Sequence, residues 1–447
     1  MDWITDYQSK FKSAEEAVAV VKDGDQVAYS EFAMASLYLD TAFARRVPEL
    51  HDIILRSTTC PFPPKAVLAD PEMKHLMYND WHFSPASRKL CDKGLCRYIP
   101  MNYHQGPHTI RSGLIGRLNV LMLMAAPPDE EGYISLGTSS SITPAYLENA
   151  DYTIVEINEN VPRTFCDEQS RVHVSQIDCF VQGPNYPMIE APTPPPNEVD
   201  RKIAELVVSL VGDGACIQLG IGSMPNAVGE LIAQAGLKDL GVHTEMLCDA
   251  YVSMAEAGCI TGKYKTTDPG KIVYTFAMGT KKLYDFLDGN ADCLLAPVDY
   301  TNDPWIIARN DNMVCLNNAI EVDIYGQTAS ETSGPRQISG TGGQLDFLTA
   351  AAHSKNGIGL ICLSSTFTDA EGTLHSRIQP YLSPCQIDTV PRIYSQFVIT
   401  EYGIADLRAK TTWERAEALI SIAHPDFRSD LIHAAEQQGL RVRNIQE

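Results

Sequence analysis

The sequence predicts an α/β protein with two open domains, whose largely parallel sheets are flanked by helices. Three observations predict this fold class. Short β-branched runs alternate with amphipathic stretches along the chain. The 447 residues exceed what one hydrophobic core usually holds. One proline-rich segment interrupts the pattern near the middle.

Individual elements follow from these patterns. Buried strands are predicted at residues 153–157, 215–219, 272–276, 358–363 and 397–400. A helix is predicted over residues 198–211, because Asn197 is a typical N-cap and acidic residues occupy the first turn. A second helix is predicted over residues 414–422.

The domain boundary is predicted in the proline-rich segment. Residues 183–197 contain Pro184, Pro187, Pro192, Pro194, Pro195 and Pro196. Proline at this density is excluded from helices and central strands, so the segment should be extended and fairly stiff. We therefore expect domains at residues 1–183 and 198–447, joined by a linker at residues 184–197.

Charge and composition exclude several classes of partner. The 56 acidic and 35 basic residues give a formal net charge of −21, which argues against nucleic acid or an anionic membrane as a partner. A polyanionic ligand would therefore need backbone N–H groups and a helix N-terminus at its site.

The cysteines and the apolar segments indicate a cytoplasmic protein without a metal site. The twelve cysteines include no CxxC pair and no Cys/His cluster at zinc spacing, which is typical of reduced thiols. The N-terminus lacks the pattern of a secretory signal. The longest apolar run, near residues 120–126, is too short to span a bilayer.

Two strand–turn–helix units share a pattern at an offset of 190 residues. Residues 23–28 lead to a helical pattern at 37–44, and residues 213–218 lead to one at 227–233. The first copy has Glu31 and Phe32 where the second has glycine, so only the second is expected to cradle a phosphate.

The second of these turns, residues 218–225, is the first candidate binding motif. Gly220 and Gly222 follow a predicted strand and precede a helix, where backbone N–H groups can approach an anion. A dinucleotide site would need glycine or alanine where Pro225 stands. A glycine-rich turn without a ligand is the other alternative.

Two further motifs carry candidate chemistry. In residues 241–246, Glu245 falls near the carboxyl end of a predicted strand, where α/β proteins bind ligands. The same residue could also be a solvated surface acid or a contact to a ribose hydroxyl. In residues 339–347, three glycines before a helix can form a nest of N–H groups for an oxyanion, although a flexible loop would look similar.

Taken in order, these three motifs resemble the acetyl-CoA hydrolase/transferase family of class I CoA-transferases. Residues 126–129 and 132–137 resemble its N-domain signature, and residues 400–408 and 424–428 its C-terminal signature. The length and residues 81–84 and 98–100 are most similar to the branch that uses butyryl-CoA with acetate, or 4-hydroxybutyrate.

The resemblance implies a set of site residues. Glu245 corresponds to the nucleophilic glutamate of the family. The implied CoA contacts are Gly220, Ile221, Gly222, Ser223, Met224, Ile320 and Gly343. Relatives often carry a lysine in the loop at 364–375, but Ala370 stands near that place and residues 366–373 contain no Lys or Arg, so Arg377 is the alternative phosphate contact.

The implied reaction is a ping-pong transfer between an acyl-CoA and a carboxylate, through a glutamyl-CoA thioester. Coenzyme A is then the substrate and the covalent intermediate, and no metal or other cofactor is expected. We also expect a homo-oligomer, whose number of subunits the sequence does not give. An acyl-CoA hydrolase is the nearest alternative, and a non-catalytic CoA-binding protein or a dehydrogenase are more distant ones.

Overall fold

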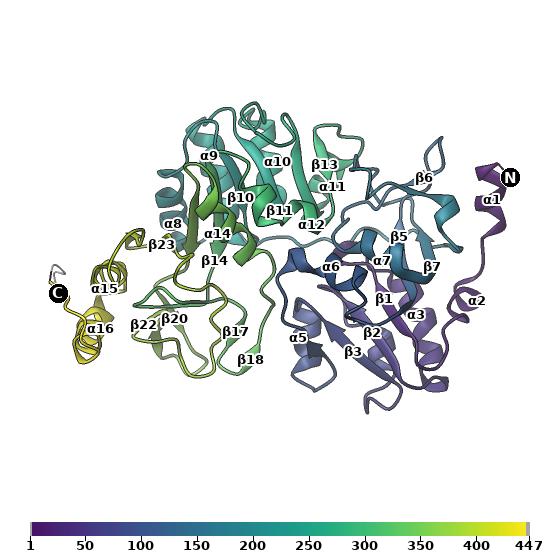
Figure 1. Cartoon of the computed structure of the whole chain (residues 1–447), viewed down its shortest axis with the longest axis horizontal. Helices are drawn as coiled ribbons and strands as arrows, with labels where there is room; N and C mark the ends of the chain where they lie inside the picture. Colours follow the sequence, from purple (N-terminus) through teal and green to yellow (C-terminus); the bar gives the residue numbers. More distant parts are fainter. Residues whose placement is uncertain (1, 444–447) are drawn as a thin grey trace. The chain divides into compact units, whose positions relative to one another are not determined.

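The computed structural model describes residues 2–443, which form two compact units (Figure 1). The first comprises the chain up to Pro192 together with Val273–Thr301. The second comprises Thr193–Ile272 together with the chain from Asn302 onward. Helices flank a large parallel sheet in each unit, so the predicted fold class is confirmed. The predicted linker, residues 184–197, contains no helix or strand, and the predicted domain limits stay a prediction.

The first unit is built on a seven-stranded parallel sheet. Its strand order is β4 (Arg97–Tyr98), β3 (Leu76–Asp80), β2 (Ile53–Ser57), β1 (Gln26–Tyr29), β5 (Leu118–Ala125), β7 (Ala150–Ile157) and β9 (Cys179–Gln182). The longer helices of this unit are α1 (Trp3–Ser9), α3 (Leu37–Arg46), α5 (Pro85–Cys91), α6 (Gly106–Arg111), α7 (Thr143–Asn149) and α11 (Lys281–Leu287). Shorter elements are α2 (Ala14–Val18), α4 (Lys65–Leu68), α12 (Val298–Thr301), β6 (Tyr133–Ile134), β8 (Val172–His173) and β13 (Cys293–Leu295).

In the second unit the strands follow the order β11 (Gly241–Leu247), β10 (Cys216–Leu219), β14 (Met313–Asn318), β19 (Ile358–Cys362), β23 (Phe397–Thr400) and β24 (Gly403–Asp406), and only β24 is antiparallel to its neighbour. The helices are α8 (Glu198–Val208), α9 (Ser223–Ala235), α10 (Asp249–Glu256), α13 (Pro304–Ile307), α14 (Gln344–His353), α15 (Thr412–Ser421) and α16 (Pro425–Gln437). Small sheets pair β15 (Glu321–Asp323) with β16 (Thr328–Ala329) and β22 (Ile378–Gln379), β17 (Thr332–Ser333) with β18 (Arg336–Gln337), and β20 (Thr366–Thr368) with β21 (Leu374–Ser376).

The predicted elements are found in the structure. The five predicted strands coincide with β7, β10, β12 (Ile272–Ala277), β19 and β23 to within a few residues. Helix α8 begins where the sequence predicts it, because Asn197 and Asp200 form a capping box. It ends at Val208, three residues before the predicted end.

The two units share the local arrangement that the sequence echo indicates. Strand β1 pairs with β2 and β5, and β10 pairs with β11 and β14 in the same parallel manner. After β1, the Glu31 carboxyl is fully buried, its Oε2 accepts a hydrogen bond of 3.1 Å from the Ile142 N–H, and burial raises its pKa to about 8. A buried acid therefore occupies the first turn, whereas the second turn has glycines.

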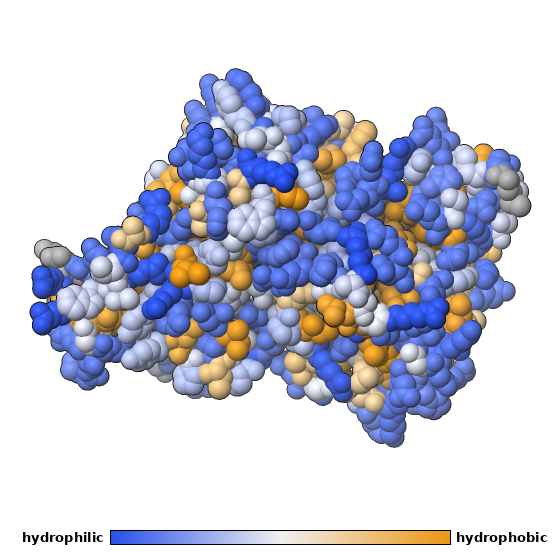
Figure 2. All heavy atoms as spheres, viewed as in Figure 1, coloured by the Kyte–Doolittle hydropathy of each residue, from blue (hydrophilic) through white to orange (hydrophobic). Residues whose placement is uncertain are grey.

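The surface in view is mainly hydrophilic, with hydrophobic residues in small separate patches (Figure 2). Within residues 2–443, no helix has the length and apolar content needed to cross a bilayer. The same residues contain no group of three or more His, Cys, Asp or Glu side chains placed to hold a metal ion.

Candidate active site

Glu245 lies near the carboxyl end of β11, two residues before the strand ends. The rest of this strand is buried, and only Glu245 is partly exposed. The neighbouring β10 is parallel to β11, so the loop after β10 leaves the sheet at the same edge. This edge is where open α/β sheets bind their ligands.

Two groups from other parts of the second unit face the Glu245 carboxylate. The Asn302 side-chain amide donates a hydrogen bond of 2.6 Å from Nδ2 to Glu245 Oε2. The Gly343 backbone N–H, directly before α14, also hydrogen-bonds to the carboxylate. A Cβ atom on Gly343 would overlap with Glu245 Oε2 and Asn302 Nδ2. Because the φ of Gly343 is an ordinary −95°, this position needs glycine for space and not for backbone freedom.

The environment makes this carboxylate unusually basic. Burial raises the pKa of Glu245 to about 7, and the negative charge of Asp346 contributes in the same direction. The hydrogen bonds from Asn302 and Gly343 oppose this rise. A carboxylate that is poorly solvated and held by two donors is suited to nucleophilic attack.

The glycine loop after β10 leaves the start of helix α9 open. Gly222 has φ +124° and ψ −179°, a backbone conformation that residues with a Cβ atom rarely adopt. Gly222 is also the N-cap of α9, and no side chain caps this helix. The first-turn N–H groups of α9 are therefore oriented to bind an anion.

Hydrogen bonds connect this loop with the other predicted contact residues. Asn318 Nδ2 donates to the Ile221 carbonyl at 3.2 Å, and Gln344 Nε2 donates to the Asn318 carbonyl at 3.0 Å. Gln344 follows Gly343 in the chain, so the loop and the nest beside Glu245 form one connected region. Ile320 lies two residues after Asn318, in the turn between β14 and β15.

Arg377 is joined to the same region. Its Nη1 donates to the Ile320 carbonyl at 2.8 Å, and its guanidinium lies 4.9 Å from the ring centre of Phe367 in β20. The hairpin of β20 and β21 spans the loop in which the sequence has no lysine or arginine. Arg377 thus places a positive charge next to a predicted CoA contact.

Sequence reasoning missed Asn302, Asn318 and Gln344. Asn302 is 57 residues from Glu245 in the chain, and no motif links the two. Gln344 lies inside the predicted glycine nest, but its role follows only from the contact with Asn318. Asn318 ends β14 and Gln344 begins α14. Polar side chains at the ends of strands and helices are too common to indicate such contacts before the fold is known.

Comparison with known proteins identifies the family. Residues 1–190 match the N-terminal domain of acetyl-CoA hydrolase/transferase, and residues 279–435 match the C-terminal domain. The chain is 46% identical to butyryl-CoA:acetate CoA-transferase of Anaerostipes caccae over 98% of both chains. It is 37% identical to 4-hydroxybutyrate coenzyme A transferase of Clostridium kluyveri, over 97% of this chain and 99% of that one.

A solved structure gives the same result. RipA from Yersinia pestis has a TM-score of 0.89 and 33% sequence identity, and the match covers 98% of this chain and all of that one. Full-length relatives above 30% identity and matches to both domains of one family agree with each other. The chain belongs to the acetyl-CoA hydrolase/transferase family.

Proposed function

We propose that this protein is a short-chain acyl-CoA:carboxylate CoA-transferase that uses butyryl-CoA and acetate, through a glutamyl-CoA thioester at Glu245. The observation that carries the proposal is the basic, poorly solvated Glu245 carboxylate, held by the Asn302 amide and the Gly343 N–H. The 46% identity to a butyryl-CoA:acetate CoA-transferase supports the choice of substrates.

The reaction begins with attack of the Glu245 carboxylate on the thioester carbonyl of the acyl-CoA. The C–S bond breaks, and an acyl-glutamyl anhydride and the CoA thiolate form. The thiolate then attacks the glutamyl carbonyl, which gives the glutamyl-CoA thioester and releases the first carboxylate. The acceptor carboxylate reverses both steps, so neither a metal nor a redox cofactor enters the balance.

The two hydrogen-bond donors at Glu245 have a role in each half of this reaction. They hold the carboxylate in one orientation before attack, which lowers the entropy cost of reaching the thioester. When the glutamyl carbonyl is attacked, negative charge develops on its oxygen, and a preorganised N–H donor stabilises that charge. Loss of one such donor typically costs about 2.7–4 kcal/mol of barrier.

The remote part of coenzyme A would be held by the glycine loop and Arg377. The open N-terminus of α9 offers N–H groups to a phosphate, and the Arg377 guanidinium supplies a positive charge in a chain of net charge −21. This binding energy can offset the cost of aligning the thioester at Glu245. The homo-oligomer and the cytoplasmic location expected from the sequence stay predictions.

A product assay tests the proposal. With butyryl-CoA and acetate, acetyl-CoA should appear while the total thioester stays constant. Loss of thioester at the same rate without acetate would instead identify an acyl-CoA hydrolase. Faster transfer to 4-hydroxybutyrate than to acetate would support a CoA-transferase whose acceptor is 4-hydroxybutyrate and not acetate.

A further inference from the structure

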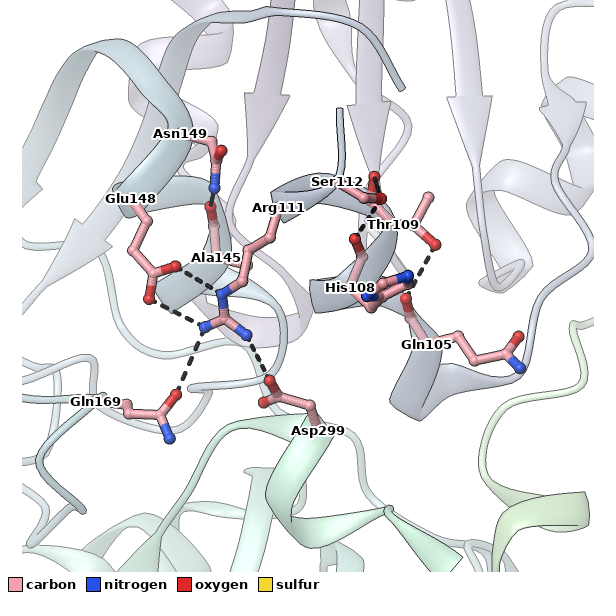
Figure 3. Close-up of polar contacts among 10 residues, drawn as sticks. All are labelled: Gln105, His108, Thr109, Arg111, Ser112, Ala145, Glu148, Asn149, Gln169 and Asp299. Atoms are coloured by element: carbon pink, nitrogen blue, oxygen red, sulfur yellow. Dashed lines mark hydrogen bonds and ion pairs between the residues drawn. The ribbon is translucent and has the colours of Figure 1, made fainter. Parts of the chain in front are cut away.

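Arg111 lies at the centre of a polar network in the first unit (Figure 3). Its Nε donates to Glu148 Oε2 at 2.6 Å and its Nη2 to Glu148 Oε1 at 3.0 Å. Its Nη1 donates to Asp299 Oδ2 at 2.5 Å, and Nη2 also reaches Gln169 Oε1 at 3.5 Å. Arg111 is the last residue of α6, so one side chain joins α6 with α7 and α12.

The guanidinium group is suited to this bridging position. The hydrogen bond to Glu148, followed by the one to Asp299, raises the pKa of Arg111, so it stays charged. Asp299 Oδ1 is buried and has no hydrogen-bond partner among residues 2–443. Without Arg111, the Asp299 carboxylate would therefore lose its ion pair in a partly buried position, where unpaired charge is costly.

Helix α12 needs contacts from other elements to hold its position. It spans only Val298–Thr301, and a single turn has too few internal hydrogen bonds to be stable by itself. Its start is fixed by the hydrogen bond of 2.9 Å from the Val298 N–H to the Ser141 carbonyl. The ion pair between Arg111 and Asp299 fixes its next residue.

The residue that follows α12 is Asn302, whose amide holds the Glu245 carboxylate. Asp299 is one helical turn before Asn302, so a shift of α12 would change the direction in which the Asn302 side chain leaves the backbone. An error of about 1 Å at a reacting group can cost on the order of a hundredfold in rate.

We propose that Arg111 is a positioning residue for the reaction, which acts through Asp299 and α12 on the Asn302 amide and so on the Glu245 carboxylate. The inference rests on the proposed role of Glu245 as the nucleophile. Arg111 is given no role in contact with the substrate.

The inference predicts a change in pH dependence as well as in rate. The hydrogen bond from Asn302 lowers the pKa of Glu245, so a loosened Asn302 lets this pKa rise. Because the nucleophile must be ionised, activity is lost as the pH falls through the pKa of Glu245. A higher pKa therefore moves the acidic limb of the profile to higher pH.

The experiment is the pH profile of kcat/KM for butyryl-CoA with acetate, from about pH 5.5 to about pH 8.5. The variants are Arg111→Ala, Asn302→Ala and the double variant, with Arg117→Ala as matched control. Arg117 also forms an ion pair in the first unit, with Asp151 at 2.6 Å, and this ion pair does not involve α12.

Arg111→Ala should move the acidic limb to higher pH and lower the rate near pH 6.5 by on the order of tenfold. The double variant should shift no further than Asn302→Ala, because both changes act on one hydrogen bond. Arg117→Ala should match the wild type.

An Arg111→Ala variant with the wild-type limb, or a double variant whose shifts add, would overturn the inference. If Arg111→Ala does not fold, Asp299→Ala removes both the ion pair and its hydrogen bond and must give the same shift. A wild-type protein that forms no acetyl-CoA would instead refute the proposed function.

Discussion

At Gly343, the absence of a side chain leaves room for the nucleophile. A Cβ atom there would overlap with Glu245 Oε2 and Asn302 Nδ2, while the backbone at φ −95° accepts any residue. Gly343→Ala should therefore fold normally but displace the Glu245 carboxylate. We expect kcat to fall by on the order of a hundredfold with a smaller change in CoA affinity, measured by steady-state kinetics and calorimetry.

Gly212→Ala is the matched control for this variant. A Cβ atom on Gly212 would meet nothing within 4 Å, and its φ is outside the left-handed region. Gly212→Ala should keep wild-type activity. A Gly343→Ala protein with wild-type kcat would show that catalysis does not depend on the position of the Glu245 carboxylate seen in the structure.

Residues differ in how well the sequence predicts their role. Gly343 and Gly222 fall in glycine-rich motifs, so the sequence marks them before the fold is known. Glu245 alone has three interpretations, as a nucleophile, a ribose contact or a surface acid, and only its place among the ordered motifs favours the first. Asn302 has no sequence signal, because its role comes from a contact across 57 residues.

Helix α9 and the loop before it are the element that would bind the CoA phosphates. Gly222 has φ +124°, so Gly222→Ala strains the loop at the open helix N-terminus by roughly 1–3 kcal/mol. We expect weaker CoA binding, measured by calorimetry, because the first-turn N–H groups of α9 change direction. Glu245 is untouched, so its pH profile should not move.

Gly236→Ala provides a control at the other end of the same helix. Gly236 is the C-cap of α9, with φ +68°, and a Cβ atom there would meet nothing within 4 Å. This variant should lower the melting temperature while CoA affinity stays at the wild-type value. Equal loss of CoA affinity in both variants would show that helix stability, and not the loop, explains the effect.

The boundaries of elements are predicted less well than their existence. Strand β23 is found at the predicted residues, because its four positions are all buried. Helix α8 ends at Val208. The apolar pattern continues to Val211, because Val211 is buried although it lies beyond the helix. Burial therefore continues where helical hydrogen bonding has ended, and a hydrophobic pattern reports only the burial.

For the whole molecule, the sequence predicts the class of fold, while contacts between distant parts of the chain are visible only in the structure. The first unit takes residues Val273–Thr301 from the second half of the sequence. Its ion pair between Arg111 and Asp299 joins residues that are 188 apart. No local pattern encodes such contacts, whereas the order of motifs over the whole chain is enough to indicate the family.

In the proposed reaction, Glu245 forms a covalent thioester with coenzyme A. The most direct measurement is the mass of the intact protein after incubation with butyryl-CoA and no acceptor, followed by borohydride reduction and peptide mapping. We expect the untreated protein to gain the mass of CoA less one water, the borohydride-treated protein to carry an alcohol in place of the carboxyl group at residue 245, and neither change in Glu245→Ala. An adduct at another residue, or a Glu245→Ala variant that transfers CoA at the wild-type rate, would contradict this mechanism.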